Sequence, residues 1–391
     1  MDFSYTEEQL SLQNTLQRFI ARDYDFERRR ALARSTLGYS AEAWSQYADL
    51  GLLALPFPEE FGGLGGNAID VMLVMELIGR GLLLEPFLST VVLCGGAIRD
   101  AAPESIKRSL LPQIGAGKLK LALACYEAAG RYDLSHVACS AVAGGDASHG
   151  NGTGWWLSGR KAVVLDGESA DYFLVSARST GDVADADGTS LFLVGRDAPG
   201  LTLFAYPTQS GGRAADLRLQ NVIVGADAVI GSVEQGLPMI ERAVDLGAAA
   251  LCAEAVGIIS ALNEATLSYL KTRKQFGVAI GKFQALQHRM ADMLIAAEQA
   301  RSMAIIAAVH CDSSDVAERR RAVSGAKAYI GQAARLVGQQ AVQLHGAMGM
   351  VDDLIVSHYF KRLTMIDLTL GDADFHLGRF SDLLLRTSFE R

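Results

Sequence analysis

The sequence predicts a multi-domain α+β protein with an N-terminal helical domain, a middle antiparallel β-barrel domain and a C-terminal four-helix-bundle domain. Three observations lead to this fold class. Helical periodicity broken by turns fills residues 1–118, short runs bounded by turn residues fill 119–232, and long helical patterns fill 233–391. The order of helices, β insert and helices therefore divides the chain into three domains.

The first domain consists of short helical patterns joined by turns. Thr6 is followed by two glutamates, which is typical of a helix N-terminus, and apolar residues then recur roughly on one face. The stretch Pro56–Gly63 contains two prolines and two glycines and predicts a turn. Further helical patterns occupy 69–79 and 86–99.

The middle domain consists of short apolar runs whose length and spacing are typical of strands in an antiparallel barrel or sandwich. Two loops, Gly150–Gly154 and Asp182–Gly188, have the composition of hairpin connections. The runs cover residues 119–125, 154–157, 162–165, 172–177, 190–194, 201–204, 215–219 and 222–224.

The last domain consists of long patterns rich in alanine and leucine, which predict antiparallel members of a bundle. They cover residues 239–270, 283–310, 317–344 and 356–368. The most apolar stretch, 246–262, contains Glu254 and is too short to span a bilayer. Its alanines and glycines favour a close-packed buried helix, so we expect no membrane partner.

Composition and charge exclude several classes of protein. Half of the 391 residues are hydrophobic and 20% are charged, which excludes a largely disordered chain. The net charge of −8 argues against nucleic acid as the main partner. The five cysteines have no paired short spacing, and the acidic start lacks a secretory signal, so we expect a reduced, cytoplasmic protein without a metal site.

The stretch Tyr269–Met293 is a basic, aromatic and glycine-punctuated loop between two long helical patterns. The planar guanidinium of Arg273 suits a pyrophosphate, because it forms bidentate, permanently charged hydrogen bonds. A glycine lets a backbone approach phosphate oxygens closely. The same residues also suit an ordinary helix–turn–helix with an exposed arginine and a buried phenylalanine, so the stretch alone does not decide between these interpretations.

Three features together resemble the acyl-CoA dehydrogenase family. They are the order of helices, β insert and helices, the segment Arg273–Gly277 with its downstream Gln284, and the segment Gln343–Gly349. The resemblance covers essentially the whole chain. Through Tyr359–Asp367 and Gly371–Asp374, the chain is most similar to the small subunit of pimeloyl-CoA dehydrogenases.

The resemblance implies a flavoenzyme that uses FAD to desaturate the α,β bond of an acyl-CoA thioester. In this family a carboxylate removes the α-proton while the flavin receives the β-hydride, and an electron-transfer flavoprotein accepts the electrons. The α-proton of a thioester is weakly acidic, so the base must be desolvated and the enolate oxygen hydrogen-bonded.

The residues that in this family meet the ADP end of a neighbouring chain's FAD are present. We call them the ADP-end cluster. Ala347 stands where a second glycine is usual, and His345 in the same loop is a further candidate for a cofactor contact. The cluster consists of Arg273, Phe276, Gln284, Gln343, Gly346 and Ala347.

The residues that surround the flavin ring in the family are absent. The segment Tyr126–Asp133, called here the ring-end segment, has Tyr126 in place of a threonine and Tyr132 in place of a serine. Val163–Leu165 replaces a Trp-x-Thr sequence that would stack on the ring and hydrogen-bond to it. These losses therefore lie near the reacting atoms.

The catalytic carboxylate is also absent from both positions that the family uses. These positions hold Leu370 and Gly247. Asp372 and Asp245 lie two residues away, and a two-residue shift points a helical side chain to nearly the opposite face. The two aspartates are therefore weak candidates, and the sequence assigns no base.

This pattern predicts the base-lacking subunit of an α2β2 acyl-CoA dehydrogenase whose larger homologous subunit supplies the flavin ring site and the base. A homo-oligomer is the simpler alternative assembly. Two other functions remain open: a flavin-dependent oxidase or monooxygenase of the same superfamily, and a non-catalytic homologue that binds CoA or FAD.

Overall fold

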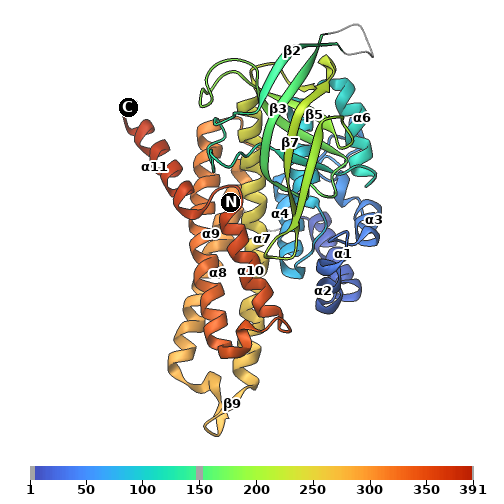
Figure 1. Ribbon diagram of the computed structural model, residues 1–391. Coiled ribbons are helices and arrows are strands. Elements are labelled where there is room, and N and C mark those ends of the chain that lie inside the picture. The colour runs from blue at the N-terminus through green and yellow to red at the C-terminus, as the bar shows by residue number, and fades with distance from the viewer. Residues whose placement is uncertain (1–4, 147–152, 390–391) are drawn as a thin grey trace. The chain divides into compact units, whose positions relative to one another are not determined.

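The computed structural model describes residues 5–146 and 153–389 (Figure 1). The chain forms two compact units. The first contains the residues up to Ala31, Asn67–Leu83 and the residues from Ala248 onward, and the second contains Leu32–Gly66 and Leu84–Gly247. The predicted fold class is confirmed, with helices at both ends of the chain and a sheet in the middle. The three domain boundaries stay a prediction.

The second unit contains an eight-stranded sheet with the order β6-β7-β3-β2-β4-β5-β8, and β1 pairs with β4. Its hydrophobic centre includes Phe173, Phe192 and Leu217, which are fully buried or nearly so. The strands are β1 (Leu121–Ala124), β2 (Ser140–Asp146), β3 (Thr153–Leu165), β4 (Tyr172–Arg178), β5 (Thr189–Gly195), β6 (Leu201–Pro207), β7 (Arg213–Val224) and β8 (Val229–Ile230).

The sheet is mixed, which corrects the prediction of a wholly antiparallel one, because β1 runs parallel to β4. Two pairs of predicted runs are single long strands, since β3 and β7 continue through irregularities in their pairing. β2 was not predicted because its sequence, rich in alanine and glycine, has no apolar alternation. The predicted loop Asp182–Gly188 connects β4 and β5, whereas the loop at Gly150–Gly154 lies largely outside the described residues.

Short helices complete the second unit. The predicted turn Pro56–Gly63 includes the 3₁₀ helix η2, and the pattern at 86–99 forms a π-helix that continues into α5. These helices are α3 (Ala41–Asp49), η1 (Leu52–Ala54), η2 (Glu59–Phe61), the π-helix η3 (Leu88–Gly95), α5 (Gly96–Ala101), α6 (Glu104–Gly115) and η4 (Ala226–Ala228), while α2 (Phe26–Arg34) is divided between the units.

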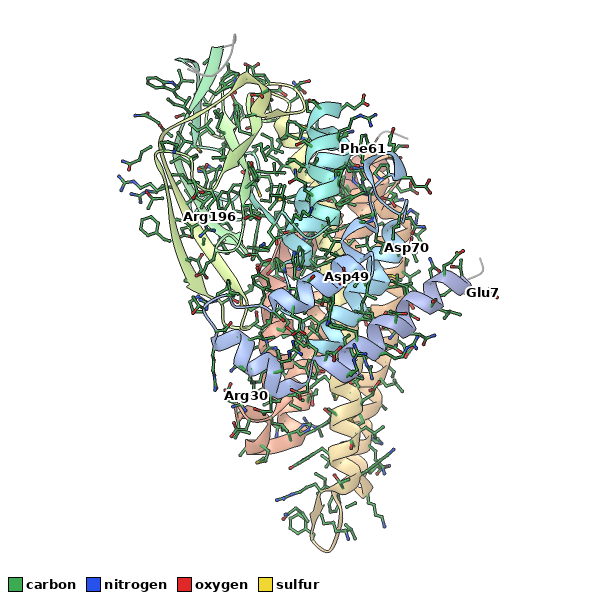
Figure 2. The ribbon with its side chains drawn as sticks, turned by 90° about the vertical axis from the view of Figure 1, so that its right-hand side faces the viewer. Glu7, Arg30, Asp49, Phe61, Asp70 and Arg196 are labelled. Atoms are coloured by element: carbon green, nitrogen blue, oxygen red, sulfur yellow. The ribbon has the colours of Figure 1, made fainter. Side chains whose placement is uncertain are left out.

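In the first unit, α1 (Glu7–Asp23) and α4 (Ala68–Gly81) begin with complete capping boxes. The side chain of Thr6 accepts a hydrogen bond from the backbone N–H of Gln9, as the sequence predicts for a helix start. Asn67 and Asp70 form the equivalent box on α4. Gln9 Nε2 also donates to Asp70 Oδ1 at 2.8 Å, which joins the two helix starts; Figure 2 labels Glu7 and Asp70.

The first unit also contains the long helices of the C-terminal part of the chain. Four of the helices match the predicted patterns to within a few residues, and α11 was not predicted. They are α7 (Gly236–Thr272, shared with the second unit), α8 (Gln284–Cys311), α9 (Val316–His345), α10 (Ile355–Leu368) and α11 (Ala373–Phe389).

Helix α7 is long and apolar enough to cross a membrane by length and composition, but 89% of its most apolar window is buried in the protein. This burial is typical of a core helix, as the sequence predicts.

Two glycines bring α4 and α7 into close contact. A Cβ atom on Gly79 would lie 2.0 Å from the carbonyl oxygen of Glu254, and one on Gly257 would lie 1.8 Å from that of Glu76.

Candidate functional site

The α7–α8 connection is a tight hairpin that carries three residues of the ADP-end cluster (Figure 1, near β9). Helix α7 ends at Thr272, and the backbone N–H of Arg273 donates to the Tyr269 carbonyl oxygen at 2.8 Å. β9 (Lys274–Gln275) and β10 (Val278–Ala279) then pair antiparallel. Phe276 and Gly277 form the two-residue turn with φ angles of 52° and 80°, the positive values that such turns require.

The side chains of this hairpin extend into solvent. Phe276 is 91% exposed, so the alternative of a buried phenylalanine is wrong, and its ring meets that of Phe283 edge-on at 6.1 Å. Gln284, at the first position of α8, is also exposed. Across residues 5–146 and 153–389, no hydrogen bond or ion pair engages the guanidinium of Arg273. The hairpin therefore presents an exposed cation and an exposed aromatic ring.

The other three residues of the cluster lie where α9 ends and the 3₁₀ helix η6 (Gly346–Met350) begins. Gly346 has φ 61° and ψ −142°, a backbone conformation that is essentially restricted to glycine. Apart from its two chain neighbours, no described residue has an atom within 4 Å of the position that its Cβ would take, so the space beside its backbone is open. Gln343 and Ala347 are exposed on either side of it.

Contacts between α7 and α9 bring the two segments to one end of the helical bundle. The Tyr269 ring stacks on the His345 imidazole with a centroid distance of 4.4 Å and an interplanar angle of 26°. Arg289, on α8, donates to Gln340 Oε1 at 2.7 Å. His345 is buried, which lowers the pKa of its imidazole, and its Nδ1 lies 2.8 Å from the Ala341 carbonyl oxygen.

These features fit a bound pyrophosphate. The backbone of Arg273 is held at the end of α7, and its guanidinium has no partner among the described residues. A guanidinium can bind phosphate oxygens in bidentate fashion. Gly346 leaves its backbone open to a close approach. The exposed ring of Phe276 supplies a surface on which a planar group can stack. The roles of the individual residues stay predictions, but the residues that the sequence singles out do converge.

The position at which the resemblance predicts the family's base lies in the turn 369–372 between α10 and α11, called here the base-position turn. Leu370 occupies it, with φ 59° and 5% exposure, and its carbonyl oxygen lies 3.0 Å from His376 Nε2. The buried ammonium of Lys327 donates to the carbonyl oxygens of Ile366, Asp367 and Gly371 at 2.8, 3.0 and 2.8 Å. The turn is firmly held but presents no carboxylate at position 370.

The two weak base candidates differ in their surroundings. The Oδ1 atom of Asp372 accepts the Phe375 N–H at 2.8 Å, directly before the first residue of α11, so this carboxylate caps the helix. Asp245 is fully buried on α7, and Gly247 on the same helix has no side chain to offer. Neither aspartate occupies a position from which the family takes its base.

The ring-end segment follows β1 and is fixed by a buried ion pair that sequence reasoning missed. Lys161 on β3 donates to Glu127 Oε1 at 2.6 Å and to Ser176 Oγ at 2.9 Å. The Glu127 carboxylate also accepts the backbone N–H groups of Ala138 and Cys139, at 2.8 and 3.0 Å. The ammonium of Lys161 and these amides hold the pKa of Glu127 below its usual value despite burial.

A second buried cation holds the segment that follows. Arg178, on β4, donates to the carbonyl oxygens of Val137 and Ser135 at 3.1 and 2.8 Å, and to four more in the loop 180–187 at 2.8 to 3.4 Å. The sequence predicts neither set of contacts, because the partners of Arg178 and the carboxylate that pairs with Lys161 lie in irregular loops whose path has no periodic signal. Half-buried Tyr126 and Tyr132 occupy the ring-end segment, and Val163 is 54% exposed.

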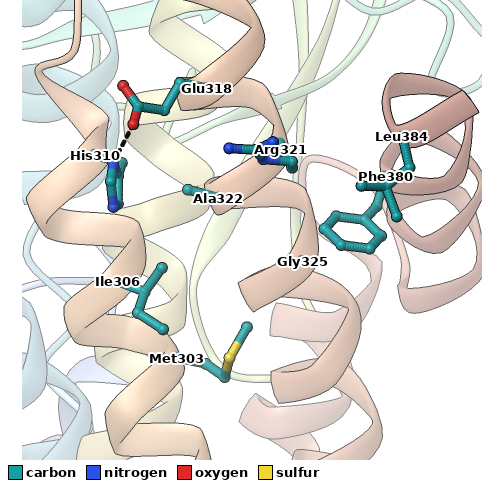
Figure 3. A pocket seen from close by; sticks show the side chains of 9 residues that line it. All are labelled: Met303, Ile306, His310, Glu318, Arg321, Ala322, Gly325, Phe380 and Leu384. Atoms are coloured by element: carbon teal, nitrogen blue, oxygen red, sulfur yellow. Dashed lines mark ion pairs between the residues drawn. The ribbon is translucent and has the colours of Figure 1, made fainter. Parts of the chain in front are cut away.

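A separate cavity of about 390 Å³ lies between α8, α9 and α11 (Figure 3). Gly325 leaves room for the Phe380 ring, since a Cβ there would lie 3.2 Å from it. His310 Nδ1 and Glu318 Oε1 lie 3.3 Å apart at its edge. Within the described part of the chain, no group of histidine, cysteine and carboxylate side chains could hold a metal, and all five cysteines are buried.

Comparison with protein families matches all three parts of the chain to acyl-CoA dehydrogenase models. The N-terminal domain model matches residues 6–118, the middle domain model 122–222 and the C-terminal domain model 234–382. The probable acyl-CoA dehydrogenase YngJ of Bacillus subtilis is 29% identical over 346 residues, which cover 86% of this chain and 87% of that protein.

Two solved structures are similar over almost their full length. A variant of the Tcur3481–Tcur3483 steroid ACAD is 31% identical, with a TM-score of 0.86, covering 98% of this chain and 99% of that chain. The ChsE4–ChsE5 complex from Mycobacterium tuberculosis is 26% identical, with a TM-score of 0.87 and the same coverage. The chain belongs to the acyl-CoA dehydrogenase family of oxidoreductases, as its resemblance predicts.

Proposed function

We propose that this chain is the base-lacking subunit of an FAD-dependent acyl-CoA dehydrogenase with α2β2 organisation. A larger homologous subunit would provide the flavin ring site and the catalytic carboxylate. This chain would complete that site by binding the ADP end of the FAD through its ADP-end cluster. The observation that carries the proposal is the combination of an exposed ADP-end cluster with a base-position turn that holds Leu370.

The exposure of the ADP-end cluster favours binding across an interface. Phe276 is almost wholly exposed and Arg273 has an exposed guanidinium, so both are available to a second chain and its cofactor. A phenylalanine that leaves nearly all of its ring in water gains nothing from the hydrophobic effect in this chain. It would gain about 1.5–3 kcal/mol if a partner and a ligand buried it.

The ADP-end cluster and the base-position turn lie far apart on the bundle. Lys327, which binds the turn, precedes His345 by 18 residues on α9, or about 27 Å at the helical rise of 1.5 Å per residue. We propose that the two regions belong to different flavin sites. The site at the base-position turn would be inactive, because Leu370 stands where a carboxylate would be needed.

Relatives support a heteromeric assembly. The ChsE4–ChsE5 structure is a complex of two differently named chains, and the Tcur3481–Tcur3483 steroid ACAD is likewise named for two. The predicted resemblance of the C-terminal segment to pimeloyl-CoA dehydrogenase small subunits stays a part of this proposal. A homo-oligomer would lack a catalytic base in every site.

The chemistry divides between cofactor and protein. FAD, when bound, accepts the hydride from the β-carbon, and an electron-transfer flavoprotein is the proposed acceptor of its electrons. In this chain Arg273 neutralises pyrophosphate charge, Gln284 and Gln343 hydrogen-bond to the ADP end, and Gly346 with Ala347 admits the phosphates. The proposal also includes three domains, residues 1–118, 119–232 and 233–391, and a cytoplasmic location.

The test uses the chain co-expressed with a larger homologue that has an intact base. Anaerobic addition of acyl-CoA is expected to bleach the flavin absorbance, and Arg273→Ala is expected to weaken FAD binding by roughly 10- to 100-fold, the value of a charged hydrogen bond. The matched control is Lys271→Ala, which removes another exposed cation, in the last turn of α7. An unchanged FAD affinity in Arg273→Ala would overturn the assignment of the ADP end.

The same preparation separates the alternative functions. Slow reoxidation of the reduced flavin by oxygen supports a dehydrogenase, whereas rapid reoxidation would identify an oxidase or monooxygenase. Absence of flavin bands from the complex would identify a non-catalytic homologue.

A further inference from the structure

The two segments of the ADP-end cluster come from different helices, and their spacing is set by side-chain contacts. Arg273, Phe276 and Gln284 follow α7, whereas Gln343, Gly346 and Ala347 follow the body of α9. No sequence-local interaction determines how far Arg273 lies from Gly346. A ligand that bridges both segments gains affinity only if this spacing is fixed before it binds.

One contact links the residues directly next to both segments. Tyr269 stacks on His345 at 4.4 Å, and its hydroxyl lies 3.5 Å from the His345 carbonyl oxygen. Tyr269 also supplies the carbonyl oxygen that binds the Arg273 N–H, and His345 immediately precedes Gly346. The stacked pair therefore joins the first residue of one segment to the first glycine of the other.

A backbone hydrogen bond and burial restrict the orientation of the two stacked rings. His345 Nδ1 lies 2.8 Å from the Ala341 carbonyl oxygen one turn earlier, which fixes the plane of the imidazole. With only 5% of the residue exposed, His345 has little room to rotate, and the half-buried Tyr269 ring covers its face. The nearby Arg289–Gln340 hydrogen bond joins α8 to α9 at exposed side chains and leaves α7 untouched.

We infer that Tyr269 and His345 are positioning residues that set the spacing of the two phosphate-binding segments. This inference rests on the proposed function, since it concerns the same ADP end of FAD. The ring contact connects α7 to α9 and fixes the distance between Arg273 and Gly346, so that one ligand can bind to both. Neither ring touches the reacting atoms.

The test compares variants of the full chain in complex with its larger homologue. Tyr269→Leu removes the stack, Tyr269→Phe keeps it and removes only the long hydroxyl contact. Tyr329→Leu is the matched control, because Tyr329 is also half-buried on the bundle and joins α9 to Gln299 of α8. FAD affinity is measured by flavin fluorescence, with ADP as a competitor, and thermal stability is measured in parallel.

We expect Tyr269→Leu to weaken both FAD and ADP binding by about 10-fold, the value of an aromatic pair. Tyr269→Phe is expected to bind within about 2-fold of the wild type, and Tyr329→Leu to lower thermal stability as much as Tyr269→Leu while leaving affinity unchanged. The inference would be overturned if Tyr329→Leu lowered FAD affinity together with thermal stability. It would also be overturned if Tyr269→Leu bound FAD with wild-type affinity. Failure of the wild-type complex to bind FAD would instead overturn the proposed function.

Discussion

Replacement of Lys161 by methionine removes the counter-charge of a buried carboxylate while keeping an apolar side chain of similar length. Lys161 is fully buried and Glu127 is 9% exposed at the side chain, with 2.6 Å between Nζ and Oε1. Removing one partner of a buried ion pair costs about 3–5 kcal/mol, because the other charge stays buried. The two backbone N–H groups on Glu127 remain, so we expect a loss of about 3 kcal/mol at pH 7.

The stability difference between wild type and Lys161→Met should depend on pH. The pKa of Glu127 is lowered in the folded wild type, so its stabilisation is complete above the unfolded pKa of about 4.3 and is lost as pH falls further. Without Lys161, burial raises the pKa of Glu127, and the carboxyl group becomes neutral at a higher pH. The difference in stability between wild type and Lys161→Met should therefore shrink as pH falls from 6 toward about 4.

Urea unfolding followed by tryptophan fluorescence measures this loss, because Trp44, Trp155 and Trp156 all belong to the second unit. The double variant Lys161→Met with Glu127→Gln should recover much of the stability, since no charge stays buried. Lys118→Met, at an exposed lysine of the same unit, should change stability by less than about 0.5 kcal/mol. A loss below about 1 kcal/mol, or one that grows in acid, would refute the reasoning.

Two further predictions concern the first unit. Burial lowers the pKa of His376 to about 3, so the folded state resists protonation while the unfolded state binds a proton below about pH 6.5. The free energy of unfolding should therefore fall by up to about 1.4 kcal/mol per pH unit below pH 6.5. Denaturant titrations should show a flatter pH dependence for His376→Phe, and an unchanged slope in this variant would contradict the prediction. Gly257→Ala should destabilise by more than about 3 kcal/mol in circular-dichroism melts, because its Cβ would overlap the Glu76 carbonyl oxygen. Gly378→Ala, which meets no atom within 4 Å, is its control, and equal melting temperatures would contradict the close helix contact.

The sequence predicts the fold well where the signal is local. The helix start at Thr6 is such a case, as are the long bundle helices, because both depend on neighbouring residues. β2 and the parallel pairing of β1 with β4 escape prediction. Pairing partners are distant in sequence, and Ser140–Asp146 has little apolar character of its own.

The site divides along the same line. The ADP-end cluster is found through its motif, and the structure brings both segments to one end of the bundle. The contact that does so, between Tyr269 and His345, leaves no periodic or compositional signal. The Lys161–Glu127 pair and the carbonyl contacts of Lys327 are equally invisible in the sequence, because each joins residues from distant elements. The sequence also does not show that Asp372, a weak base candidate, has a capping role, since its carboxylate accepts a backbone N–H at the start of α11.

The most direct test of the central claim is the number of flavins and the activity of the chain with and without its larger homologue. The account predicts one FAD for every two chains in the purified complex, dehydrogenation of acyl-CoA by that complex, and no dehydrogenation by this chain alone. One FAD for every chain, or robust dehydrogenation by the isolated homo-oligomer, would contradict it.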